Sequence, residues 1–186
     1  MTYKFQSPAV FLIGPTASGK TDTAIKLAEK YPFEIISVDS AMVFKDMNIG
    51  TCKPSSQNLE RIPHHLIDIL NPDAKFDAGL FISYVESAVK NIINNNKIPL
   101  FVGGTMMFHK VLFDGIHDFP RDENLRQEIN LTKKNNGYEH LLDELKQLDP
   151  ETFQSIDVKN PRRVERALEI IKLTKTKLSL LKLEPS

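Results

Sequence analysis

The chain has 186 residues, of which 41% are hydrophobic and 26% are charged, and its formal net charge at neutral pH is zero. This length is sufficient for one substantial hydrophobic core, and no apolar run approaches a membrane span. Cys52 is the only cysteine, which excludes an internal disulfide bond and predicts a reducing, cytoplasmic location with this thiol as a half-buried filler. The apolar stretch 9–13 that follows Lys4 is too short for a secretory signal.

The first 115 residues alternate between strand-like and helix-like segments. Apolar strands are expected at 9–13, 33–39 and 98–105, with a further possible strand at 64–69. Helices are expected at 19–30, from an N-cap at Asp77 to about Asn95, and at 106–113, with a loop or short helix around 54–63. This alternation predicts an α/β fold, a parallel sheet flanked by helices whose ligands lie at the carboxyl ends of the strands.

Strand signals end after Gly115. Three later segments have helical patterns: DENLRQEINLTKK, GYEHLLDELKQL and NPRRVERALEIIKL. We therefore expect an α/β core at 1–115 and a helical subdomain at 116–186.

Charge is unevenly distributed between these parts. Residues 159–182 contain eight Lys or Arg and two Glu, a net charge of +6, whereas residues 1–158 carry −5. Such a basic segment suggests contact with a polyanion, although a solvated helix face would have a similar composition.

The basic segment contains a helix expected to begin near Asn160, with Pro161 in its first turn. Its apolar residues fall on one face, and three arginines fall on the opposite face or its flank: Arg162, Arg163 and Arg166. An exposed arginine cluster of this kind suits phosphates or the bases of an RNA loop.

A phosphate-binding motif lies between the first strand and the first helix. Gly14, Gly19, Lys20 and Thr21 fit G-x-x-x-x-G-K-[ST], with Pro15, Thr16, Ala17 and Ser18 between the glycines. In such a P-loop the backbone N–H groups surround phosphate oxygens, the lysine adds positive charge, and the Thr21 hydroxyl is a ligand for Mg²⁺. A glycine-rich connector is the alternative.

The position of the carboxylates argues against an ordinary nucleotide hydrolase. The strand IPLFVGGT ends without the aspartate that helps to hold magnesium in many such enzymes. The carboxylate is instead Asp39, at the end of the second strand, where it could act as a base toward a substrate on the diphosphate. The alternative is that Asp39 caps the next turn through its side chain.

Five segments in order resemble the motifs of bacterial tRNA dimethylallyltransferases, also called tRNA isopentenyltransferases. They are GPTASGKT, ISVDSAMVFKDMNIGTCKP, IPHHLIDI, PLFVGGTMMFHKVL and NPRRVERALEIIKLT, and they extend from about Val10 to Thr174. The resemblance implies transfer of a dimethylallyl group from dimethylallyl diphosphate to the exocyclic amine of the adenosine beside the anticodon of tRNA. It also implies that the loop, commonly described as ATP-binding, holds the diphosphate of this donor.

The resemblance also implies roles for individual residues. Asp39 matches the proposed base, Lys20 stabilises the leaving diphosphate, and Thr105 contacts the target nucleotide, although its hydroxyl could instead cap a helix. Ser40, Ala41 and Met42 match a segment near the target base, and Arg126, with one residue of different spacing, matches a further tRNA contact. The cluster Arg162, Arg163 and Arg166 would grip the anticodon stem-loop, whereas His64 and His65 are expected to be structural or to line the pocket.

The sequence departs from the family pattern in several places. Phe44 stands where a tyrosine is common, and Met42 stands where smaller or polar residues are frequent, and both of these departures are mild. Lys175 stands where glycine usually follows the last helix, which changes the expected turn. The chain then ends at LLKLEPS, without the segment that returns to the core in the family, so we expect a fragment or a shortened product with exposed apolar surface.

Two other functions remain open from the sequence. A small-molecule or nucleotide kinase could use the same loop, with Arg162, Arg163 and Arg166 as a lid. A catalytically inactive tRNA-binding remnant would bind the stem-loop and give no product.

Overall fold

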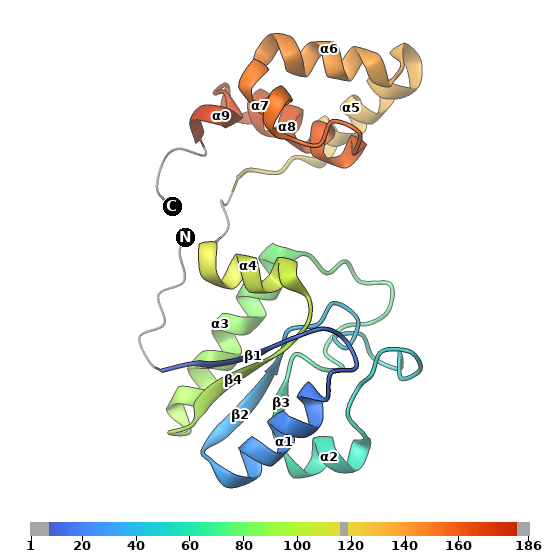
Figure 1. Cartoon of the computed structure of the whole chain (residues 1–186). Coiled ribbons are helices and arrows are strands. Elements are labelled where there is room, and N and C mark those ends of the chain that lie inside the picture. Colours follow the sequence, from blue (N-terminus) through green and yellow to red (C-terminus); the bar gives the residue numbers. More distant parts are fainter. Residues whose placement is uncertain (1–7, 116–118, 182–186) are drawn as a thin grey trace. The chain divides into compact units, whose positions relative to one another are not determined.

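The computed structural model describes residues 8–115 and 119–181. The chain divides into two compact units, 1–116 and 117–186 (Figure 1). The first unit contains two clusters of buried apolar side chains and the second contains one. Among the described residues no helix is both long and apolar enough to cross a membrane.

The first unit is built on a four-stranded parallel sheet. Its strands are β1 (Val10–Ile13), β2 (Phe33–Ser37), β3 (His64–His65) and β4 (Ile98–Gly103), in the order β1-β4-β2-β3. The expected parallel α/β fold is therefore confirmed. The strand expected at 64–69 is shorter than the sequence suggests, because Leu66 and Asp68 have φ values of 64° and 54°, which are incompatible with an extended strand.

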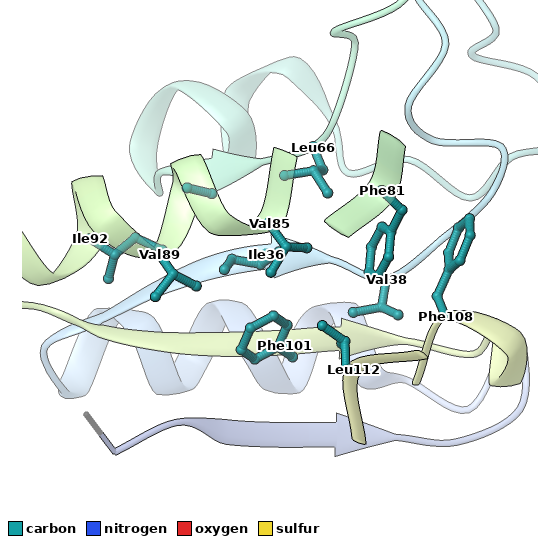
Figure 2. Close-up of a cluster of buried hydrophobic side chains, with 11 residues drawn as sticks. Ile36, Val38, Leu66, Phe81, Val85, Val89, Ile92, Phe101, Phe108 and Leu112 are labelled. Atoms are coloured by element: carbon teal, nitrogen blue, oxygen red, sulfur yellow. The ribbon is translucent and has the colours of Figure 1, made fainter. Parts of the chain in front are cut away.

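Helices cover both faces of this sheet: α1 (Lys20–Lys30), α2 (Ser56–Arg61), α3 (Ala78–Asn94) and α4 (Met106–Asp114). Ile36 and Phe101, on neighbouring strands, pack against α3 and α4, as Figure 2 shows. Ile35 and Leu100, one position away on the same strands, pack on the opposite face against Ala24 and Ile25 of α1. Since successive strand residues point to opposite faces, these apolar runs fill two cores.

A side-chain cap marks the start of α3. Asp77 caps α3, and its carboxylate accepts a hydrogen bond from the Leu80 amide at 3.0 Å. The expected N-cap is confirmed, and Asn95 follows the last helical residue.

The second unit is entirely helical in its described part. Its helices are α5 (Glu123–Asn136), α6 (Tyr138–Leu148), α7 (Pro150–Ser155), α8 (Pro161–Thr174) and α9 (Leu178–Leu181). The apolar face expected for α8 is buried around Val164 and Leu168, against Ile129 of α5 and Leu141 of α6. Asn160 caps α8 through its side chain, as expected.

Two short helices, α7 and α9, were not expected from the sequence, and both depend on the buried Asp149. Its carboxylate accepts hydrogen bonds from the amide and hydroxyl of Thr152, at 3.1 and 2.6 Å, and from the amide and hydroxyl of Ser179, both at 2.9 Å. Burial alone would raise the pKa of Asp149, but these bonds outweigh it and hold the pKa at about 2. A carboxylate 30 residues away therefore anchors α9, which no local sequence signal could indicate.

Candidate active site

The phosphate-binding motif forms the connection between β1 and α1. Gly19, with φ 77° and ψ 14°, adopts a left-handed conformation as the N-cap of α1, and no side chain caps this end. The amides of the first helical turn therefore lack helical partners and favour an anion. The Lys20 ammonium lies across the loop, where it donates to the Pro15 carbonyl oxygen and contacts the Ser18 hydroxyl at 3.3 Å.

Asp39 lies two residues beyond β2, on the edge of the sheet where the phosphate loop also lies. Its Oδ1 accepts hydrogen bonds from the amides of Ala41 and Met42, at 2.8 and 3.2 Å. The turn-capping role that the sequence left open is therefore present. No described residue donates to Oδ2, so one carboxylate oxygen remains available to a ligand.

Thr105 follows β4, the strand between β1 and β2. It is the N-cap of α4 by position, but its side chain makes no capping hydrogen bond. The capping role considered for this hydroxyl is therefore absent, and the half-buried residue faces the cavity.

The two glycines before Thr105 allow close contact between the three strand ends. A β-carbon on Gly103 would lie 2.1 Å from the carbonyl oxygen of Val38, and one on Gly104 would lie 2.9 Å from that of Gly14. The buried His109 supports this turn because its Nε2 donates to the Gly103 carbonyl oxygen at 3.2 Å, and burial lowers the pKa of its ring. The sequence identified the glycines only as part of a motif; their steric role appears in the tertiary structure.

These elements surround one cavity of about 560 Å³ within the first unit. The expected residues among its lining are Thr16, Ala17, Ser18, Gly19, Lys20, Thr21, Asp39, Ser40, Ala41, Met42 and Thr105. Gly14 and Pro15 belong to the loop but are not among the lining residues. Further lining residues that sequence reasoning did not select come from the segment after Asp39, notably Gly50, Thr51 and Cys52. Cys52 is exposed, which corrects the expectation of a half-buried filler.

His64 lines the cavity, whereas His65 makes an ion-pair contact with Glu34, with 2.8 Å between its Nε2 and Oε2 of Glu34. The Nδ1 of His64 lies 2.7 Å from the carbonyl oxygen of Ile62; since a carbonyl can only accept, this nitrogen carries the proton. Burial lowers the pKa of His64, so the ring is held neutral and its buried Nε2, which has no partner among the described residues, is an acceptor. Adjacent strand positions thus separate the two rings, as expected.

The four arginines expected to contact tRNA fall into two groups. The Arg162 and Arg163 side chains are exposed and form no hydrogen bond or ion pair within residues 8–115 and 119–181. Arg166 differs from the expected exposed cluster, because it is half-buried and its guanidinium donates to Glu169 at 2.6 Å. It also donates to the carbonyl oxygens of Phe119 and Pro120, both at 3.0 Å.

Arg126 joins the same arrangement. Its Nε donates to Glu169 at 2.9 Å, and this hydrogen bond raises the pKa of Arg126. Burial would raise the pKa of Glu169, but hydrogen bonds from Arg166, the Asp122 amide and Arg126 together lower it. Glu169 is 2% exposed and had no role in the sequence interpretation; a glutamate between the buried Leu168 and Ile170 was the available signal.

Comparison with known proteins identifies the family. A profile described as IPP transferase matches residues 42–185. The chain belongs to this family. The family expected from the motifs is thus confirmed.

Solved structures agree with this assignment. A tRNA delta(2)-isopentenylpyrophosphate transferase from Staphylococcus epidermidis is 37% identical, with a TM-score of 0.55, over 95% of this chain and 58% of that one. The full-length tRNA isopentenylpyrophosphate transferase from Bacillus halodurans is also 37% identical, with a TM-score of 0.58, over 90% of this chain and 56% of that one. A eukaryotic dimethylallyltransferase acting on tRNA is 29% identical, with a TM-score of 0.85, over 96% of this chain and 44% of that one. This IPP transferase chain therefore spans about half the length of these relatives.

Proposed function

We propose that this IPP transferase transfers the dimethylallyl group of dimethylallyl diphosphate to the exocyclic amine of the adenosine 3′-adjacent to the anticodon in tRNA. One observation supports it above all: a phosphate-binding loop and a carboxylate with one uncommitted oxygen line the same cavity. This reaction requires a site that binds the departing diphosphate and a group that accepts a proton from the amine.

The reaction can be written with the residues of the cavity. The adenine amine attacks the allylic carbon of the donor, a carbon–nitrogen bond forms, and the carbon–oxygen bond to the diphosphate breaks. Asp39 takes the proton that the amine loses, through the oxygen that the turn leaves free. Lys20, turning from the Pro15 carbonyl toward the diphosphate, and the amides at the start of α1 stabilise the charge on the departing oxygens.

Thr21 is the magnesium ligand that we propose. No three His, Cys, Asp or Glu side chains among the described residues gather into a metal site. Thr21, which lines the cavity, is the residue that would hold Mg²⁺ through its hydroxyl, because this cation takes oxygen ligands. When bound, Mg²⁺ neutralises charge on the diphosphate.

The target adenosine must leave its base stack to reach a cavity in the protein. We infer that Ser40, Ala41, Met42 and Thr105 contact this base, because they line the cavity beside Asp39. Arg162 and Arg163 contact RNA phosphates, since their guanidinium groups have no partner in the described part of the chain. Arg126 and Arg166, held by Glu169, provide fixed rather than adaptable contacts to the anticodon stem-loop. We also propose that the reaction takes place in the cytoplasm.

The proposal is tested by incubating the chain with dimethylallyl diphosphate labelled in the prenyl group and an anticodon stem-loop RNA. We expect label in the RNA, on the adenine amine, and none when the target adenosine is replaced by guanosine. Binding of both substrates without prenyl transfer would indicate that this chain is a catalytically inactive tRNA-binding remnant. Turnover of ATP without prenylated RNA would indicate a kinase.

A further inference from the structure

The segment after Asp39 displays an isoleucine beside the cavity. We call residues 44–53 the rim loop, because its Gly50, Thr51 and Cys52 line the cavity. Ile49, immediately before them, is 98% exposed, whereas the next most exposed large apolar side chain of the described residues, Met106, is 65% exposed. An isoleucine in this position contributes no packing to the fold.

The rim loop is held in place by a buried lysine. The side chain of Lys53 is 3% exposed, and its ammonium donates to the Phe44 carbonyl oxygen at 2.5 Å, to Asp68 at 2.6 Å and to Asn48 at 3.3 Å. An ammonium has three hydrogens, so this set satisfies every donor. Phe44 lies at the start of the loop, Asn48 lies immediately before Ile49, and Asp68 lies outside the loop.

A further hydrogen bond closes the tip of the loop. The hydroxyl of the buried Thr51 donates to the carbonyl oxygen of Met47 at 2.7 Å. Ile49 lies between these two residues. The loop is therefore fixed on both sides of Ile49, and the exposed position of this side chain is imposed by polar contacts.

We infer that Ile49 is an apolar wedge that enters the RNA base stack when the target nucleotide moves into the cavity. The inference rests on the proposed function. Removing one base leaves a gap between its neighbours, and apolar side chains inserted at such steps stabilise an unstacked nucleic acid. Ile49 directly precedes residues that line the cavity. When the target base enters the cavity, Ile49 is therefore next to the gap that the base leaves in the RNA stack.

An RNA partner fits this surface better than a protein partner does. A stable protein interface covers about 800 Å² on each partner, far more than one isoleucine offers. On the same loop Met47 adds a side chain that is only 41% exposed. In this inference Lys53 is a positioning residue, since it reaches the RNA only through the loop that it fixes.

The test uses the full chain and an anticodon stem-loop in which 2-aminopurine replaces the target adenine. Its fluorescence rises when the base leaves the stack, and it lacks the reacting amine, so unstacking is measured without chemistry. We expect Ile49→Ala to lower the fluorescence rise of the bound RNA about fivefold, and Ile49→Leu to retain most of it. Lys53→Ala should lower it as Ile49→Ala does.

The matched control is Ile93→Ala on α3, where the isoleucine is 36% exposed and does not line the cavity. This variant should behave as the wild type. If bound RNA unstacks equally with Ile49→Ala, the wedge is refuted while the proposed function stands. If the wild-type chain binds no RNA, both fail. A change in sedimentation of the protein alone on Ile49→Ala would show a protein contact and overturn the inference.

Discussion

Gly104 approaches the phosphate loop so closely that a β-carbon on it would lie 2.9 Å from the carbonyl oxygen of Gly14. The turn after β4 thus fixes the position of the loop that follows β1. The glycine pair before Thr105 is a steric requirement of the site, because the three strand ends must converge on one cavity.

Gly104→Ala should weaken pyrophosphate binding about tenfold while the chain stays folded, because the added methyl group displaces the loop backbone. Titration calorimetry with pyrophosphate measures the effect. The matched variant Gly103→Ala, whose methyl group would meet the Val38 carbonyl oxygen at 2.1 Å, should instead lower the free energy of unfolding by about 3 kcal/mol. Equal behaviour of the two variants would contradict this division.

Two substitutions separate the two roles of Asp39. Asp39→Asn keeps a carbonyl oxygen for the amides of Ala41 and Met42 but removes the base, so prenyl transfer should fall about 100-fold to 10,000-fold with RNA affinity and stability retained. Asp39→Ala should lose as much transfer and also about 1 kcal/mol of stability, since the turn loses its acceptor. Single-turnover prenyl transfer, fluorescence anisotropy of labelled RNA and thermal unfolding of the protein distinguish the two variants. Full activity of Asp39→Asn would disprove the role of Asp39 as the base.

Among the arginines of α8, Arg162 and Arg163 should act only as RNA contacts, whereas Arg166 should also stabilise the fold. Replacing Arg162 and Arg163 by alanine should leave stability unchanged and flatten the dependence of log affinity on log salt by about 1.5, one phosphate each. Arg166→Ala should lower the free energy of unfolding by about 2 kcal/mol, because the buried carboxylate of Glu169 loses a partner. RNA titrations at several salt concentrations, with unfolding curves, measure both. An unchanged salt slope in the double variant would show that the face of α8 with Arg162 and Arg163 is exposed to solvent without contacting RNA.

Asp149 should make the helical unit sensitive to acid. Its pKa of about 2 lies below the ordinary value of 3.8, so its contribution is fully present above pH 4 and is lost as pH falls toward 2. The difference corresponds to about 2 kcal/mol. Hydrogen exchange at the Ser179 amide, which donates to Asp149, follows this loss. Asp149→Asn should speed exchange at neutral pH and remove most of the acid dependence; an unaltered pH profile would contradict the assignment.

Lys175 terminates α8 in a left-handed conformation, with φ 56° and ψ 23°, at the position where the sequence lacks the usual glycine. Lys175→Gly should raise the free energy of unfolding by about 1 kcal/mol, because glycine adopts this conformation without the steric penalty of a β-carbon. Lys175→Ala is the control and should give no gain. Urea titration of both variants measures the difference.

Much of the first unit could be predicted from local sequence. Successive apolar residues such as Ile35 and Ile36 of β2 pack on opposite faces because both faces of the sheet are covered, and Asp77 marks the start of α3 through capping. In the second unit Asn160 marks the start of α8 in the same way. The parallel arrangement then required the phosphate loop and Asp39 to meet at one edge. The shortness of β3 was not predicted, because leucine rarely adopts the left-handed conformation that ends the strand at Leu66.

The order of most elements, the phosphate loop, Asp39 and the family could be predicted before the fold was known, because they depend on neighbouring residues and their spacing. Which polar groups are already engaged became visible only in the folded chain. Glu169 binds Arg126 across 43 residues, and Asp149 anchors Ser179 across 30. Lys53 is joined to Asp68 across 15 residues, which leaves Ile49 exposed. Hydrogen bonds act over a few ångströms in space, and that proximity exists only once the chain has folded.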